Sequence, residues 1–231
     1  LGALVHGINE GLANAHCVLP SPDDRFVYIP YVKDNNALYQ YSFDAETGKL
    51  LPLEPADTGP PEPSGPRHQA YHPSLPITYF SNEQAPGLSA YDIADDGALA
   101  LRQLVPALDL EFPAEGWSSS DVAITPEGNH AYVGIRGRGD LEDVIARFAI
   151  DDTGAATHLG NTPTGDIPWG LALSPDGSYL LVTSFGEGLL QAYQIGGNGD
   201  LSLSASQVID PKISDLVALP IESGLLENSP Q

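Results

Sequence analysis

The residues best suited to chemistry lie in one stretch, Gly65 to Glu83, which reads G-P-R-H-Q-A-Y-H-P-S-L-P-I-T-Y-F-S-N-E. It holds one arginine, two histidines and a glutamate, in a chain with nine Lys and Arg in total. A guanidinium group binds carboxylates or phosphates through parallel hydrogen bonds, and an imidazole exchanges protons near neutral pH. The stretch therefore indicates either a site or an ion-paired strand end, and the elements around it must decide between the two.

A repeated phrase organises the chain around this stretch. It occurs four times, as S-P-D-D-R-F-V-Y-I from Ser21, H-P-S-L-P-I-T-Y-F from His72, T-P-E-G-N-H-A-Y-V from Thr125 and S-P-D-G-S-Y-L-L-V from Ser174. The prolines of successive phrases are 51, 53 and 49 residues apart. Because proline fixes φ at the second position of a turn, each phrase predicts a hairpin between two strands.

Short apolar strands are expected on both sides of each turn. Those before it are Cys17–Leu19, Gln69–Tyr71, Val122–Ile124 and Leu171–Leu173, and those after it are Phe26–Ile29, Ile77–Phe80, Ala131–Val133 and Tyr179–Val182. A third strand alternates around Tyr39, Tyr91, Phe148 and Tyr193, and a polar turn then leads to a fourth. Four strands that recur about every 50 residues are typical of propeller blades, since one sheet alone cannot bury both faces.

The fold class predicted from this repeat is all-β, a β-propeller of four-stranded antiparallel blades, with residues 1–231 as a single domain. Four complete units and a lone final strand near Leu216–Leu219 fit a closed ring of four or five blades. They also fit the last blades of a larger ring whose N-terminal blades are absent. We favour the larger ring, because the chain opens at Leu1 inside an apolar pattern.

The repeat also places equivalent residues at one end of the inner strands. Counting six residues before and ten after each proline gives pairs expected close to opposite one another, His16 with Val32, Arg67 with Glu83, Ser120 with Arg136, and Trp169 with Phe185. The next position along adds Cys17, His68, Asp121 and Gly170. These side chains are predicted to converge at the mouth of the central channel, where a small molecule would bind.

Several of these residues also have a purely structural interpretation. Arg67 and Glu83 can form a cross-strand ion pair, which contributes about 0–1 kcal/mol when exposed. His72 lies inside the turn phrase, where capping or packing is its expected role. The remaining histidines, His6, His130 and His158, are expected at the surface or between blades.

Composition narrows the possible partners. An excess of acidic residues, 31 Asp and Glu, gives a net charge of -22, which disfavours nucleic acids and anionic membrane surfaces because both bind clusters of Lys and Arg. No apolar stretch approaches the roughly 20 residues that span a bilayer. A single cysteine, Cys17, precludes an internal disulfide, so we expect a cytoplasmic protein. We find no metal or cofactor motif and expect neither; the oligomeric state is not predicted.

A set of motifs identifies a family resemblance. The motifs are G-P-R-H followed by H-P and N-E, S-P-D-D-R-F-V-Y-I-P with N-A-H-C before it, and D-V-A-I-T-P-E-G-N-H-A-Y-V with a following arginine. Together they resemble the bacterial 6-phosphogluconolactonase family, which is similar to the fungal carboxymuconate lactonizing enzymes. The resemblance implies the C-terminal four to five blades of a seven-bladed propeller. It also implies hydrolysis of a sugar-phosphate lactone, 6-phosphogluconolactone, in the pentose phosphate pathway.

The family's motif positions carry over to His16, Arg67, His68, Glu83 and Arg136. As a hypothesis, His16 activates water, since an imidazole has an ordinary pKa near 6.5. The two arginines would bind the phosphate or carboxylate and offset the oxyanion, and Glu83 would orient Arg67 or act as the base. The candidate catalytic residues are thus His16, Arg67, Glu83 and Arg136, and the candidate substrate-binding residues are His68, Ser120, Asp121 and Trp169.

Departures from the family pattern keep two alternatives open. Trp169 stands where the family often has a basic residue, and Cys17 follows His16 where serine is common. Trp169 and Phe185 would favour a flatter, less charged substrate, as in a lactonizing or lactone-opening enzyme that acts on a carboxymuconate-like acid. The second alternative is a non-catalytic propeller that binds proteins, for which we expect a flat rim with the charged residues facing solvent.

Overall fold

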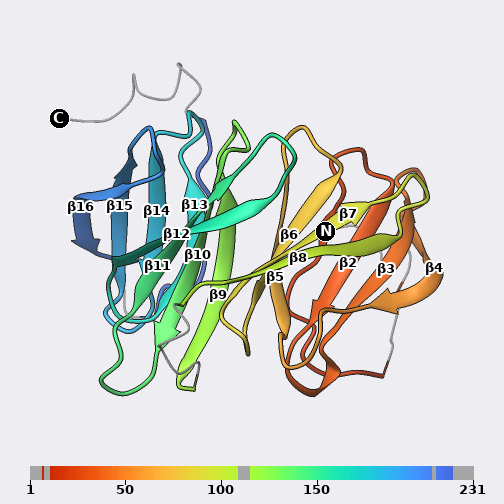
Figure 1. Cartoon of the computed structure of the whole chain (residues 1–231), viewed down its shortest axis with the longest axis horizontal. Coiled ribbons are helices and arrows are strands. Elements are labelled where there is room, and N and C mark those ends of the chain that lie inside the picture. The colour runs from red at the N-terminus through yellow and green to blue at the C-terminus, as the bar shows by residue number, and fades with distance from the viewer. Residues whose placement is uncertain (1–6, 8–10, 109–114, 210–211, 221–231) are drawn as a thin grey trace.

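The computed structural model describes residues 7, 11–108, 115–209 and 212–220, which form four antiparallel sheets of four strands each (Figure 1). We call these sheets blades 1 to 4. Blade 1 contains β1 (Leu19–Pro20), β2 (Phe26–Tyr31), β3 (Ala37–Asp44) and β4 (Lys49–Thr58), and blade 2 contains β5 (Pro66–Tyr71), β6 (Ile77–Asn82), β7 (Gly87–Ile93) and β8 (Leu99–Pro106). Blade 3 contains β9 (Trp117–Ile124), β10 (His130–Gly137), β11 (Val144–Ile150) and β12 (Ala156–Pro163), and blade 4 contains β13 (Pro168–Leu173), β14 (Tyr179–Ser184), β15 (Leu189–Ile195) and β16 (Leu201–Val208). The one helical element of the described residues is a 3-10 turn, η1 (Lys33–Asn35).

The blades stand next to one another in chain order, and the inner strands β5, β9 and β13 pack against one another in turn (Figure 1). The predicted all-β propeller architecture is confirmed, as are the three outer strands of each repeat. No helix among the described residues is long and apolar enough to cross a bilayer.

The hydrophobic core lies between neighbouring blades rather than inside any one of them. Three clusters fill the contacts between blades 1 and 2, blades 2 and 3, and blades 3 and 4. Strand β6 illustrates the consequence, because all six of its residues are buried and its sequence I-T-Y-F-S-N does not alternate. Tyr79 packs toward blade 3 and Phe80 toward blade 1, so each face of the sheet is covered by a neighbour.

In each of blades 1, 2 and 3, one tyrosine forms a hydrogen bond to the following blade. The hydroxyls of Tyr28, Tyr79 and Tyr132, at matching positions of the repeated phrase, donate to the carbonyls of Gly97, Gly154 and Gly199 at 2.8, 2.7 and 3.3 Å. Each acceptor lies in the turn between the third and fourth strands of the following blade. These bonds pair the buried hydroxyls and set the blades in register with one another.

The first residue of the repeated phrase holds the hairpin turn. Ser21 Oγ accepts the N–H of Phe26 at 2.9 Å, and Ser174 Oγ accepts that of Tyr179 at the same distance. His72 has the same capping role in blade 2, where its Nδ1 accepts a hydrogen bond from the N–H of Leu75 at 3.0 Å. The capping role expected for His72 is therefore confirmed.

Two predicted strands differ from the structure. The first inner strand is β1, Leu19–Pro20, rather than Cys17–Leu19, because the register shifts by one residue between the Ala15–Tyr31 bridge and the Leu19–Tyr28 pair. The expected strand at Leu216–Leu219 is wrong, because residues 213–220 form no strand. Leu216 lies against Gly170 of β13, but this segment pairs with no strand of the described residues. His6 lies outside the described residues.

Candidate functional site

The candidate site is built on a β-bulge that recurs in blades 2, 3 and 4. In each inner strand two consecutive residues face a single residue of the second strand. These sets are Arg67 and His68 against Ser81, Ser120 and Asp121 against Gly134, and Trp169 and Gly170 against Thr183. An extra residue interrupts the alternation of side chains along a strand, so residues adjacent in sequence need not point to opposite faces. All six bulged residues were expected at the channel mouth.

The observed pairs differ from the predicted ones by two residues, one that is already present in the ladder next to the turn and one that the bulge adds. Arg136 pairs with Ser118 rather than with Ser120, and the N–H of Glu83 bonds to the carbonyl of Gly65 at 2.7 Å. The register prediction was wrong because counting from the turn misplaced the first ladder pairs by one residue and assumed an uninterrupted ladder beyond them. The side chains of the predicted residues nevertheless meet, since long arginine side chains reach across this offset.

A serine hydroxyl supports the bulge of blade 2. Ser81 Oγ accepts the N–H of His68 at 3.2 Å and donates to the carbonyl of Ser120 in blade 3 at 2.7 Å. In blade 3 the facing residue is Gly134, where a Cβ atom would lie 2.4 Å from Ser120 Oγ. Ser120 is fully buried, and its hydroxyl lies 2.6 Å from the carbonyl of Pro168 in blade 4. The hydroxyl of Ser120 therefore links blades 3 and 4, and we do not propose that it contacts the substrate.

Two arginines share one glutamate and one tryptophan. Arg67 Nε donates to Glu83 Oε2 at 3.0 Å, and Arg136 Nη2 lies 3.8 Å from the same oxygen. Arg136 Nη2 also donates to the carbonyl of Ser119 at 2.7 Å. The guanidinium carbons of Arg67 and Arg136 lie 5.3 and 4.9 Å from the ring centre of Trp169, within the range of a cation–π contact. Residues from blades 2, 3 and 4 thus meet in one cluster.

This cluster carries more positive than negative charge. Burial lowers the pKa of Arg67 to about 10, with a further contribution from the charge of Arg136, so Arg67 remains protonated at neutral pH. Glu83 is the carboxylate that pairs with both cations, and the charges of Asp121 and Asp143 also act on Arg67 and Arg136, respectively. Within the described part of the chain, Arg67 Nη1 and Arg136 Nε are buried without a hydrogen-bond acceptor. Unpaired buried donors are costly, and an anion or water that supplied acceptors would offset that cost.

A second cluster joins His68 to Asp121. His68 Nδ1 lies 2.8 Å from Asp121 Oδ1. The same carboxylate accepts two backbone N–H groups, from Val122 at 2.8 Å through Oδ1 and from Leu171 at 2.9 Å through Oδ2. Blades 3 and 4 therefore fix the carboxylate, and the carboxylate fixes an imidazole of blade 2.

His16 lies against this second cluster. Its ring centre is 5.1 Å from that of His68, although the residue as a whole stays exposed. Partial burial of the ring, followed by the charges of Arg67 and His68, lowers the pKa of His16 to about 4. His16 does not keep the ordinary pKa on which its expected role as a base rested.

The remaining expectations concern a metal site and the aromatic pair of Trp169 and Phe185. Among the described residues, no group of three or more His, Cys, Asp and Glu is placed to hold a metal ion. Phe185 stacks on Trp169 with ring centres 5.0 Å apart. The residue that sequence reasoning missed is Ser81, which lies two positions before Glu83 in the S-N-E motif and supports His68 through its hydroxyl.

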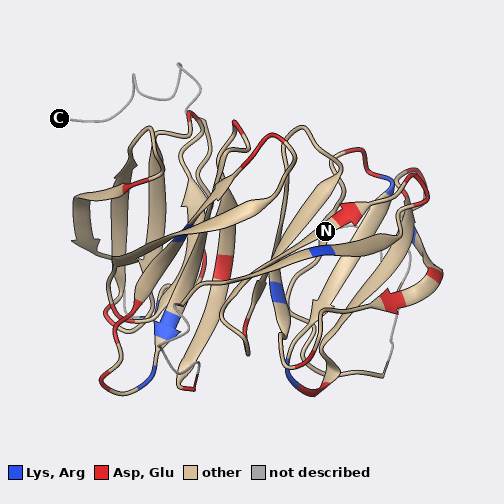
Figure 2. Ribbon diagram, viewed as in Figure 1, with Lys and Arg blue, Asp and Glu red and all other residues tan. Residues whose placement is uncertain are grey.

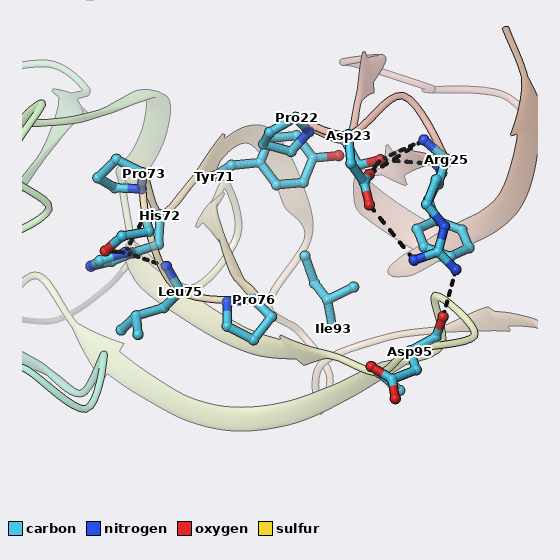
Figure 3. A pocket seen from close by; sticks show the side chains of 14 residues that line it. Pro22, Asp23, Arg25, Tyr71, His72, Pro73, Leu75, Pro76, Ile93 and Asp95 are labelled. Atoms are coloured by element: carbon cyan, nitrogen blue, oxygen red, sulfur yellow. Dashed lines mark hydrogen bonds and ion pairs between the residues drawn. The ribbon is translucent and has the colours of Figure 1, made fainter.

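A separate cavity of about 290 Å³ lies between blades 1 and 2 (Figure 3). Its wall includes Pro22, Arg25, Tyr71, Pro76 and Ile93, which belong to the turn ends of the strands. Arg25 at its edge is held by the carbonyl of Asp95 at 2.8 Å. The cavity therefore lies at the opposite ends of β5 and β6 from the arginine cluster, and none of the predicted site residues lines it.

The blades follow one another in a row, and charged residues gather where bulges interrupt the inner strands. These features define the class of the protein: this chain is a β-propeller with a charged cluster at one end of its inner strands. The family follows from a comparison with known families. A model described as "Lactonase, 7-bladed beta-propeller" matches residues 5–216, and the chain belongs to that family.

Individual relatives agree with this family. The chain is 30% identical over 195 residues to a 6-phosphogluconolactonase of Cronobacter sakazakii and 29% identical over 195 residues to one of Klebsiella pneumoniae. Each match covers 83% of this chain and 56% of the relative, so the chain spans little more than half their length. The structure of a periplasmic gluconolactonase from Pseudomonas aeruginosa has the same fold, with a TM-score of 0.78, 22% identity, and coverage of 87% of this chain and 55% of that one.

Proposed function

We propose that this protein hydrolyses the lactone of a sugar phosphate, 6-phosphogluconolactone to 6-phosphogluconate, a step of the pentose phosphate pathway. The observation that carries the proposal is the Arg67–Glu83–Arg136 cluster, with its surplus cation and two unpaired N–H groups. An arginine fork matches the oxygens of a phosphate or a carboxylate, and both occur along this reaction. The names of the two bacterial relatives support the same substrate.

Lactone hydrolysis requires two roles of the site residues, stabilising negative charge and accepting a proton from water. Water attacks the carbonyl carbon, the carbonyl oxygen gains negative charge, and collapse of this intermediate breaks the ring C–O bond. Arg67 and Arg136 offset the developing charge or hold the phosphate, and Glu83 keeps Arg67 in place through its 3.0 Å bond. The neighbouring imidazoles of His16 and His68 are the groups available to take the proton from water.

The site geometry favours this function over the two alternatives. An aromatic-derived acid would need the ring of Trp169 free, whereas two guanidinium groups already lie over it. A protein-binding platform would present its arginine to solvent, whereas the Arg67 side chain is 1% exposed and that of Glu83 is 18% exposed. Both features disfavour the two alternatives.

Side-by-side assays of 6-phosphogluconolactone and a carboxymuconate-type lactone test the proposal. The protein should turn over the sugar phosphate, and Arg67→Ala should lower kcat/KM by about 10²–10³, the typical loss for removing one donor to an oxyanion. Arg102→Ala is the matched control, because Arg102 pairs with Asp92 on the outer strands of the same blade. Full activity in Arg67→Ala, or preference for the carboxymuconate lactone, would contradict the proposal.

The compartment belongs to the same proposal. We propose a cytoplasmic protein, a choice supported by its single cysteine, Cys17, which is unpaired. Cell fractionation with compartment markers checks this, and recovery with periplasmic markers would overturn it.

A further inference from the structure

We propose that His68 is the proton acceptor of this site and that Asp121 is the residue that positions it. The inference rests on the proposed lactone hydrolysis and assigns the residue that takes the proton from water, which the proposed function leaves open. It depends on which imidazole is oriented, and by what.

The hydrogen bonds of Asp121 determine which ring nitrogen of His68 carries the proton. An ionised carboxylate accepts hydrogen bonds and donates none, and Asp121 already accepts the N–H groups of Val122 and Leu171. The 2.8 Å contact between Asp121 Oδ1 and His68 Nδ1 is therefore made by an N–H on Nδ1. A neutral imidazole with its proton on Nδ1 carries its lone pair on Nε2, which is the form that accepts a proton from water.

The geometry keeps Nε2 of His68 available. Among the residues that the structure describes, none forms a hydrogen bond with this nitrogen, and the His68 side chain is 26% exposed. The bulge holds the backbone of His68 through Ser81, while Asp121 holds the ring. Two anchors on different blades thus fix the imidazole beside the arginine cluster, because Arg67 is the preceding residue of the same bulge.

The competing bases are less well placed. Glu83 Oε2 already accepts a hydrogen bond from Arg67 and lies 3.8 Å from Arg136, so both cations compete for its lone pairs. In the described part of the chain no carboxylate forms a hydrogen bond or ion pair with His16, and its pKa of about 4 lies far below the neutral pH at which a general base works best. His16 remains beside the site as a neutral ring that can hydrogen-bond to the substrate.

The proposed step balances without a cofactor. His68 Nε2 takes a proton from water as the water oxygen forms a bond to the lactone carbonyl carbon. The imidazolium, stabilised by Asp121, then returns this proton to the ring oxygen as the ring C–O bond breaks. The products are a hydroxyl group and a carboxylic acid, which ionises in water, and the imidazole returns to its starting form.

Chemical rescue provides the main test. His68→Ala should lower kcat by about 10²–10⁴, the usual contribution of a general base, with a smaller change in KM. Added imidazole should restore part of the rate, a response that the loss of a merely structural side chain would not show. His158→Ala, on the outer strand β12, is the matched control and should keep the wild-type rate.

The tautomer of His68 is measured independently of turnover. Nitrogen-15 NMR of the wild-type protein should show the proton of His68 on Nδ1, and Asp121→Asn should lower kcat while reducing the population of that tautomer. A thermal melt of each variant shows whether it remains folded.

The outcomes separate this inference from the proposed function. If the wild-type protein does not hydrolyse the lactone, the proposed function itself fails. If it does, a His68→Ala variant of normal rate, a lost rate that imidazole does not restore, or a His68 proton on Nε2 overturns the assignment and leaves the function standing. A larger loss of kcat in His16→Gln than in His68→Gln would also overturn it.

Discussion

Trp169 is the residue that joins the two arginines, and its role is testable. Both guanidinium groups lie within 5.3 Å of its ring centre, so the ring fixes two like charges near each other. A desolvated cation–π contact contributes about 2 kcal/mol or more, and an exposed one about 0.5–1 kcal/mol. We expect Trp169→Leu to raise KM for 6-phosphogluconolactone about 5- to 30-fold, with a smaller change in kcat, in steady-state kinetics.

Trp169→Phe is the control for this prediction, because it keeps an aromatic face for the arginines. It should recover most of the wild-type KM. Equal KM values for Trp169→Leu and the wild-type protein would show that the ring does not organise the anion site.

The sequence predicts which side chains gather at the site but not their pairing partners. The spacing of Arg67, Glu83 and Arg136 from the repeated prolines is enough to bring them together, because each residue is counted from the proline of its own hairpin. The contact between His68 and Asp121 could not be predicted, since it depends on how far each bulge turns a side chain. The lowered pKa of His16 depends on the neighbouring residues of folded blades, which one sequence does not display.

At the scale of the element, the bulge and its hydroxyl support position the imidazole. Ser81→Ala removes the acceptor for the N–H of His68 and the donor to the carbonyl of Ser120. Leaving a buried polar group unpaired costs about 1–3 kcal/mol, so we expect the free energy of unfolding to fall by about that amount. We also expect kcat to fall, because the strand that carries His68 loses its support; denaturant melts and kinetics measure the two effects.

Ser89→Ala separates the two effects of that change. Ser89 is also fully buried in blade 2, and its hydroxyl lies 3.0 Å from Asn82 Oδ1 but, among the described residues, bonds to neither bulged residue. It should lose stability to a comparable extent and keep kcat. Loss of kcat in both variants would mean that general loosening of the blade, rather than the bulge, controls the rate.

The elements themselves were predictable because each is specified locally. Proline and a capping residue such as Ser21 or Ser174 mark the first hairpin of every blade, and the apolar runs on either side have the length of a strand. The bulges were not predictable, because an extra residue in a strand leaves no mark in its hydrophobic pattern. The false strand at Leu216–Leu219 followed from the same reliance on pattern, since an apolar run becomes a strand only beside a partner.

At the scale of the whole molecule, the positive charge of the arginine cluster is opposite in sign to the net charge of the protein. The net charge is -22, and many of the acidic residues lie in loops at the ends of the strands (Figure 2). An anionic substrate is therefore repelled at long range and attracted at short range. Salt screens these two forces unequally, because exposed charges are screened much more than buried ones such as Arg67, which is 1% exposed.

This imbalance predicts an unusual salt dependence. The screening length falls from about 30 Å at 0.01 M salt to about 8 Å at 0.15 M, which removes most of the long-range repulsion and little of the contact with Arg67. We expect kcat/KM for 6-phosphogluconolactone to rise about 2- to 5-fold over this range, within the reach of electrostatic effects on association. An uncharged lactone without the phosphate should show no such rise, since it feels neither force. A fall of kcat/KM with salt for the phosphorylated substrate alone would mean that the arginine cluster, and not the acidic surface, governs its approach.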